Sequence, residues 1–164
     1  MNREILFRGR SLSDGIWVFG DLEYERNKGS LGKVRIHTYK EDGSYDKQYL
    51  VESNSVGQFT GLSDSNGAKI FEGDIVKRFS VDSDSLMYYY CGVVLFDNND
   101  ASFKLSMFKQ VFDGRNIGLF EGVDDIMCNF VTNVVYDGQT PQEDEYCYEV
   151  IGNIYDNPKL PSTK

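Results

Sequence analysis

The sequence predicts a mainly β protein, built from short, curved strands of the kind that close into a small barrel, with at most one or two short helices. Aromatic residues make up 14% of the 164 residues, and only three residues are proline, a composition that favours strands. Most apolar runs are short, and Gly, Asp, Asn and Ser residues separate them. A chain of this length is expected to form one domain.

The first half of the chain predicts two hairpins. Ile5–Phe7 leads into a turn signal at residues 13–15, after which the apolar run resumes at Ile16–Phe19. The next run, 33–39, alternates in the manner of a half-buried strand: one side carries Val34, Ile36 and Thr38, and the other carries Lys33, Arg35, His37 and Tyr39. Asp42-Gly43 then turns the chain into a strand at Tyr45–Val51.

The second half predicts three antiparallel strands followed by a less clear segment. The strands cover Asp74–Phe79, Met87–Phe96 and the alternating residues 103–111, and Gly92 indicates a bend or bulge in the middle strand. Hydrophobic residues between 123 and 134 recur at helical spacing, which predicts an amphipathic helix. The β-branched residues after Phe130 favour a strand instead, so both interpretations stay open there. A last strand is expected over Tyr146–Ile154.

Charge and cysteine content narrow the class of protein. The net charge of −9 and the pI near 4.6 argue against a nucleic-acid partner, because a phosphate backbone would be repelled. The acidic stretch 137–145 is typical of a solvated loop. Three widely spaced cysteines fit neither a disulfide framework nor a zinc site, and no apolar run is long enough to span a bilayer. We therefore expect a soluble, cytoplasmic protein without a membrane partner.

The stretch TGLSDSNGAKIFEGDIV at 60–76 raises the question of a metal site. Read from Asp64 as an EF-hand loop, it has Gly at position 4 and Lys at position 6, so the calcium pattern fails. No phosphate-binding glycine motif occurs either. Tight turns explain the pattern better, because Gly, Asn and Asp favour turn geometry. The predicted structural turn positions in the chain are Gly61, Asp64, Asn66, Gly67, Gly73, Asp74, Gly152, Asn157 and Pro158.

No set of residues predicts catalysis. His37 is the single histidine, and the sequence nominates neither a nucleophile within its reach nor an orienting partner. The close carboxylate pairs lie in turn-like or polar settings, as solvated loops do: Glu72 and Asp74, Asp82 and Asp84, Asp124 and Asp125. Cys91 sits in an apolar strand without a positive neighbour. We predict no catalytic, cofactor-binding or metal-binding residues, and a small-molecule ligand stays unknown.

Exposed aromatic residues are the best candidates for a contact surface. Three consecutive tyrosines in one strand must point to both faces, so at least one is expected to be exposed. Together with Trp17 they could form a stacking platform for single-stranded nucleic acid, but such platforms accompany a basic groove. Protein contact fits better, because tyrosine is enriched at interfaces. The predicted interaction surface consists of Trp17, Tyr88, Tyr89 and Tyr90.

Five blocks in the same order resemble the YopX family of phage and prophage proteins. They read MNREILFRGR, GIWVFGDL, VGQFTGLSDSNGAKIFEGDIVKRF, GVVLFDN and EVIGNIYDNPKL. The resemblance implies a single domain over 1–164, with an N-terminal hairpin region at about 1–55 and an SH3-like barrel core at about 56–160. It also implies a bacterial host cell, and it carries over no catalytic residues, because the family has none established.

The leading interpretation is a phage or prophage accessory protein that is not an enzyme. It would act through a protein partner or through self-association as a homo-oligomer. Three alternatives stay open: an acidic mimic of nucleic acid, a direct nucleic-acid-binding protein, and an enzyme of unrecognised class.

Overall fold

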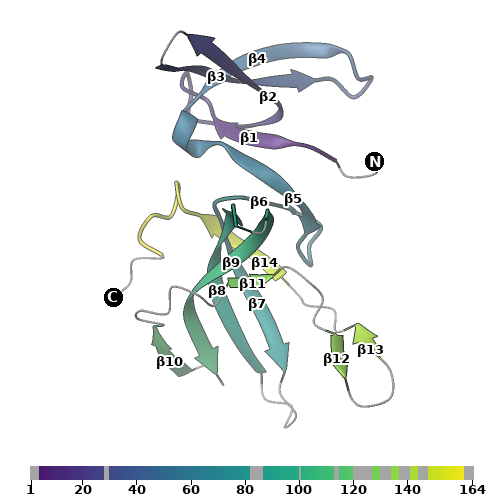
Figure 1. Ribbon diagram of the computed structural model, residues 1–164, viewed down its shortest axis with the longest axis vertical. Coiled ribbons are helices and arrows are strands. Elements are labelled where there is room, and N and C mark those ends of the chain that lie inside the picture. Colours follow the sequence, from purple (N-terminus) through teal and green to yellow (C-terminus); the bar gives the residue numbers. More distant parts are fainter. Residues whose placement is uncertain are drawn as a thin grey trace. The chain divides into compact units, whose positions relative to one another are not determined.

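The structure is a computed structural model, and it confirms a mainly β protein (Figure 1). It describes residues 4–27, 30–81, 87–99, 101–112, 115–119, 127–129, 134–136, 141–143 and 148–160. Within these ranges one short helix occurs, a 3-10 turn at Ser53–Ser55. The strands are β1 (Phe7–Arg10), β2 (Trp17–Asn27), β3 (Ser30–Tyr39), β4 (Tyr45–Val51), β5 (Gly57–Ser63), β6 (Lys69–Phe71), β7 (Asp74–Val81), β8 (Met87–Asp97), β9 (Ser102–Phe112), β10 (Arg115–Leu119), β11 (Met127–Asn129), β12 (Val134–Tyr136), β13 (Pro141–Glu143) and β14 (Tyr148–Asn153).

The chain forms two compact units. Unit 1 comprises Met1–Leu62 and Lys69–Glu72, and unit 2 comprises Ser63–Ala68 and Gly73–Lys164. The loop between β5 and β6 therefore belongs to unit 2, although both flanking strands lie mainly in unit 1. The division into a hairpin region and a barrel core within one domain stays a prediction.

Unit 1 contains one sheet with the strand order β4-β3-β2-β1-β5-β6 (Figure 1). Both predicted hairpins are confirmed, because β1 pairs with β2 and β3 pairs with β4, each antiparallel. On its other edge β1 has two partners: Phe7 and Arg8 pair with β5, whereas Ser11, just beyond the strand, bridges to Val51 of β4. This single bridge brings the end of β4 next to the residue that follows β1.

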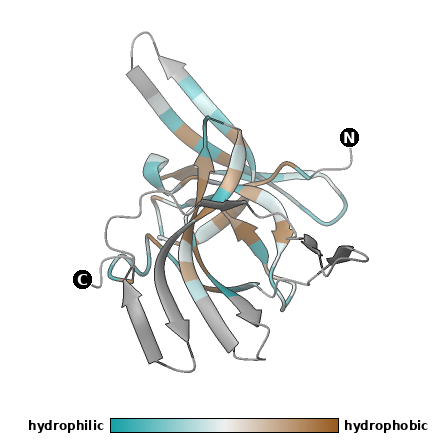
Figure 2. Ribbon diagram, turned by 60° about the horizontal axis from the view of Figure 1, so that its bottom comes forward, coloured by the Kyte–Doolittle hydropathy of each residue, from teal (hydrophilic) through white to brown (hydrophobic). Residues whose placement is uncertain are grey.

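One core cluster of unit 1 lies on one side of this sheet and consists of the buried residues Val18, Val34, Ile36 and Val51. Phe59, Ile70 and Phe71 of β5 and β6 are buried as well. The alternation predicted for β3 is confirmed, since Val34 and Ile36 are both buried. Gly20 permits the close approach of β2 and β3, because a Cβ there would lie 1.9 Å from the carbonyl oxygen of His37. Figure 2 shows hydrophobic and hydrophilic residues alternating along the described strands.

Unit 2 contains a second sheet with the order β10-β9-β8-β7-β14, and β11 also pairs with β9. The three predicted antiparallel strands β7, β8 and β9 are confirmed. So is the bulge, because the pairing of β8 with β9 shifts between Cys91 and Gly92. Among the side chains of this sheet that the structure describes, the buried hydrophobic ones are Ile75, Val76, Cys91, Val94 and Leu105. Strands β12 and β13 form a separate pair.

Two expectations need correction or restriction. The predicted helix is wrong at Met127–Asn129, which is strand β11, and the segment after Phe130, where helix and strand both stayed open, is strand β12 from Val134. Pairing with β9 gives the backbone of β11 its hydrogen-bond partners, and β-branched residues such as Val134 and Val135 pack well in strands. Residues 120–126 and 130–133 lie outside the described part. The last strand ends at Asn153, and residues 146–147 of its predicted range also lie outside.

The described strands do not form the predicted barrel. The described strands form two largely antiparallel sheets and the small β12–β13 pair, and no closed barrel is found among them. Of the acidic stretch 137–145, Pro141–Glu143 is strand β13, and the rest lies outside the described residues.

Candidate functional site

The side of the unit 1 sheet opposite the core carries most of its charged side chains. Residues directly opposite each other on neighbouring strands share a face, and Asp21 pairs with His37 while Glu23 pairs with Arg35. Alternation along β2 and β3 therefore places acidic residues of one strand against basic residues of the other. We call this surface the charged face; it comprises Phe19, Asp21, Glu23, Glu25, Arg35, His37, Tyr39 and Tyr45.

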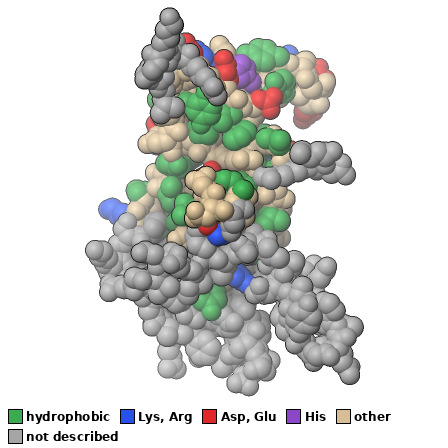
Figure 3. Space-filling model, in the orientation of Figure 1, with side chains coloured by type: hydrophobic (Ala, Val, Ile, Leu, Met, Phe, Trp, Pro, Cys, Tyr) green, Lys and Arg blue, Asp and Glu red, His purple; other side chains and the backbone are tan. Residues whose placement is uncertain are grey.

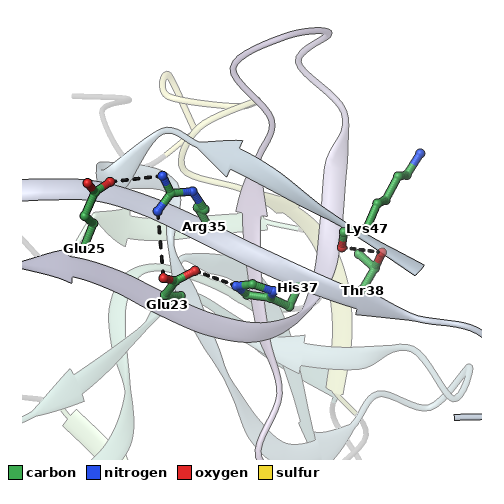
Figure 4. A network of polar contacts seen from close by, with 6 residues as sticks. All are labelled: Glu23, Glu25, Arg35, His37, Thr38 and Lys47. Carbon is green, nitrogen blue, oxygen red and sulfur yellow. Dashed lines mark hydrogen bonds and ion pairs between the residues drawn. The ribbon is translucent and has the colours of Figure 1, made fainter. Parts of the chain in front are cut away.

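Glu23 occupies the centre of an ion-pair network on the charged face (Figure 4). Its carboxylate lies 2.6 Å from Nε2 of His37 and 3.9 Å from Nη1 of Arg35. The other side of the Arg35 guanidinium contacts Glu25 at 3.0 Å. All four side chains are partly exposed, so solvent screens these pairs. The network joins β2 to β3 and presents fixed charge to solvent.

Exposed aromatic rings adjoin this network. The ring of Tyr45 lies 6.1 Å from that of His37 and 6.3 Å from that of Tyr39. Tyr39 and Tyr45 are 51% and 54% exposed, and Phe19 on β2 is 48% exposed. A hydrogen bond to the carboxylate of Asp21 raises the pKa of the Tyr39 hydroxyl, and partial desolvation adds to this. Figure 3 shows the single histidine, in purple, among acidic and hydrophobic side chains.

Trp17, the first predicted surface residue, is half-buried in an aromatic cluster around Arg8. The Arg8 guanidinium lies 4.7 Å from the ring centre of Trp17 and 5.1 Å from that of Phe71, and it donates a hydrogen bond to the carbonyl oxygen of Glu72. Such cation–π contacts stabilise a buried arginine. Phe71 in turn contacts Phe19 and Phe59, with ring centres 5.4 Å and 5.5 Å apart.

Sequence reasoning missed the role of Arg8. The signal was the alternation of the two hairpin strands, which places Arg8 opposite Phe19. It also missed the acidic row Asp21, Glu23 and Glu25, although its spacing of two residues matches that of Arg35 and His37 on the next strand.

The predicted tyrosines lie in strand β8 of unit 2, where Tyr88, Tyr89 and Tyr90 pair with Ser80, Phe79 and Arg78 of β7. Tyr90 is half-buried, and the side chains of the other two lie outside the described part. Trp17 belongs to unit 1, so the predicted surface consists of two parts, each of which is placed only within its own unit.

Asp64 organises the turn that the sequence predicts at residues 64–67. Its Oδ1 accepts hydrogen bonds from the amides of Asn66 at 2.8 Å and Ala68 at 2.9 Å, and Oδ2 accepts one from the amide of Val150 at 3.2 Å. Burial alone would raise the pKa of the Asp64 carboxyl, but these hydrogen bonds outweigh it and lower the pKa below the ordinary 3.8. The carboxylate thus ties the 63–68 loop to β14.

The other predicted turn residues differ in backbone conformation and burial. Gly67 and Gly73 both have a φ of +82°, a conformation that favours glycine. Gly61, with a φ of +92°, lies inside strand β5 rather than in a turn. Asp74 is 2% exposed at the start of β7.

Near the C-terminus, Gly152 and Asn157 meet at the end of β14. The Asn157 side-chain oxygen accepts a hydrogen bond from the amide of Asn153 at 3.2 Å, and a Cβ on Gly152 would lie 2.2 Å from that oxygen. Pro158 follows in the next turn.

The described residues offer neither a metal-binding cluster nor a membrane-spanning helix. They contain no group of three or more His, Cys, Asp or Glu residues placed to hold a metal ion. The same part of the chain has no helix whose length and apolar character would let it cross a membrane.

Comparison with known proteins gives a family. The chain is similar over nearly its whole length to protein EF1440 from Enterococcus faecalis, with 18% identity, coverage of 98% of this chain and 99% of that one, and a TM-score of 0.45. No curated protein matches. The YopX family, described as YopX protein, matches residues 6–161 of the chain. The chain therefore belongs to the YopX family.

Proposed function

We propose that this YopX-family chain is a phage- or prophage-encoded accessory protein that works in the bacterial cytoplasm as a non-catalytic protein-interaction module. An SH3-like arrangement of its second sheet and homo-oligomer formation belong to the same proposal. The observation that carries it is the charged face, where Phe19, Tyr39 and Tyr45 are each about half exposed beside the Glu23 network. Aromatic residues with a polar rim are characteristic of protein contact surfaces.

The alternatives have weaker support. An acidic mimic of nucleic acid needs carboxylates arrayed at phosphate spacing, whereas Glu23 and Glu25 both form ion pairs with Arg35. Direct binding of nucleic acid needs a row of basic residues beside exposed rings. On the charged face Tyr39 forms a hydrogen bond with Asp21, and His37, beside the ring of Tyr45, lies against Glu23.

A comparison of matched variants tests the proposal. Immobilised full-length protein is incubated with lysate of a bacterial host, with and without nuclease, and the retained proteins and nucleic acids are quantified. The variant Tyr39→Thr/Tyr45→Thr keeps β-branched residues in the strands and should lose a specific protein that the native chain retains. The control variant Leu12→Ser, at an exposed residue outside the charged face, should retain it.

Self-association is measured on the same three proteins by sedimentation. Loss of an oligomer in the double-tyrosine variant alone would indicate that the charged face contacts a second copy. Retention of nucleic acid only, or equal retention of protein by all three chains, would contradict the proposal.

A further inference from the structure

The 63–68 loop contains a pair of residues whose backbone can react spontaneously. Asn66-Gly67 is the single Asn-Gly pair in the 164 residues, and both residues are exposed. In such a pair the backbone nitrogen of glycine can attack Cγ of asparagine, because glycine has no side chain to hinder it. The new N–Cγ bond forms as the nitrogen loses its proton to solvent, the Cγ–Nδ2 bond breaks, and ammonia leaves. Water then opens the succinimide to aspartate or isoaspartate.

In the folded turn, hydrogen bonds oppose this reaction. The attacking nitrogen of Gly67 donates a hydrogen bond to the carbonyl oxygen of Asp64, at 3.0 Å. The amides of Asn66 and Ala68, on either side, are both held by Oδ1 of Asp64. Rotating the Asn66-Gly67 peptide toward Cγ requires these bonds to break. The negative charge of Asp64 also opposes the loss of a proton from Gly67.

We infer that Asn66 is a site of spontaneous succinimide formation whose rate is governed by Asp64, so that the reaction proceeds only from an opened turn. Local opening of this kind sets the rate of any slow chemistry that the closed state forbids. This inference does not depend on the proposed function.

The reaction also changes the attachment of the loop to β14. Isoaspartate inserts an extra carbon into the backbone between residues 66 and 67, which lengthens the turn that Asp64 spans. The same carboxylate holds the amide of Val150, and the amide of Ser65 donates to the carbonyl oxygen of Tyr148 at 2.9 Å. A lengthened turn and a second negative charge therefore loosen the loop from the start of β14.

The test is the rate of mass gain in the peptide that contains residue 66, measured on full-length protein incubated at neutral pH. Asp64→Ala should react about tenfold faster or more than the native chain, the effect of losing hydrogen bonds to a charged group. Asp46→Asn removes a carboxylate from the exposed part of β4 and should react at the native rate. Asn66→Gln identifies the signal, because its longer side chain reacts far more slowly.

A second measurement uses the native chain, so it does not depend on whether a variant folds. The native chain should react much more slowly in buffer than when unfolded in urea, and equal rates would overturn the inference. An unchanged rate in a folded Asp64→Ala chain would also overturn it. The isolated isoaspartyl product should show faster hydrogen exchange at the amide of Val150 than the native chain; equal exchange would contradict the coupling to β14.

Discussion

The two units hold their sheets together in different ways. In unit 1, strands β1 to β4 pair with their neighbours in the sequence, and side chains such as Glu23 and His37 join them from strand to strand. In unit 2, the edge strand β14 returns to β7, with Val150 opposite Val76, and Asp64 fixes the same strand from a third segment. Hairpins close over few residues, whereas distant strands must offset a larger loop-closure entropy. In unit 2, buried polar contacts such as that of Asp64 with Val150 contribute the stabilisation that offsets this entropy.

The largest expected effect comes from truncating one core residue in each unit. Ile36 and Ile75 are both fully buried, so Ile36→Ala and Ile75→Ala should each lower the free energy of unfolding by roughly 2–5 kcal/mol. Trp17, the single tryptophan, lies in unit 1, so its fluorescence follows the unfolding of that unit. Hydrogen exchange of the β7 and β8 amides follows unit 2.

Each substitution should act first on the probe of its own unit. The control is Leu12→Ala, at a residue 61% exposed, which should change the free energy of unfolding by less than about 0.5 kcal/mol. Equal shifts of both probes in both variants would show that the units unfold as one, and the comparison between them would then lose its thermodynamic basis.

An intermediate effect is expected at Asp64. Asp64→Asn should lower the free energy of unfolding of unit 2 by about 1–3 kcal/mol at neutral pH, because buried amides lose a charged acceptor. The folded-state pKa of Asp64 is lowered, so its contribution is present above the unfolded value near 3.8 and is lost as the pH falls through the lower folded value.

The measurement for Asp64 is a series of denaturant unfolding curves from neutral pH to below pH 3.8. The difference between the native chain and Asp64→Asn should shrink as the pH falls. A constant difference would mean that the amide contacts do not depend on the charge of Asp64.

The smallest effect is expected in the charged face of unit 1. Glu23→Gln should lower the free energy of unfolding by at most about 1 kcal/mol, because its ion pairs are partly exposed. High salt should reduce the difference further. Glu41→Gln, at an exposed residue in the turn after β3, is the matched control. A loss at Glu23 as large as that at Asp64 would reverse the contrast drawn between the two units.

Features that depend on near neighbours in the sequence were predictable. The alternation of Val34 and Ile36 and the turn at Asp42-Gly43 predicted the β3–β4 hairpin, and Gly92 predicted the bulge in β8. The helix prediction was wrong at Met127–Asn129, because three- and four-residue spacing over so short an apolar segment does not distinguish helix from strand. Pairing with β9 decided for strand at Met127–Asn129.

The candidate site, too, was predictable only where it depends on near neighbours in the sequence. The outward side of β3, with Arg35 and His37, could be read from the alternation of that strand alone. Its acidic partners on β2 required the register, in which Glu23 lies opposite Arg35. The cluster around Arg8 required contacts with Phe71 and Glu72, more than sixty positions away.

The sequence by itself determined a chain of short strands and tight turns, because side-chain alternation and the backbone preferences of Gly, Asn and Asp act within a few residues. Tertiary structure alone decided which strands became neighbours: β1 meets both β5 and the end of β4, and β14 meets β7. Those choices depend on contacts between distant segments, such as that of Asp64 with Val150, whose stabilisation exists only once the chain has folded.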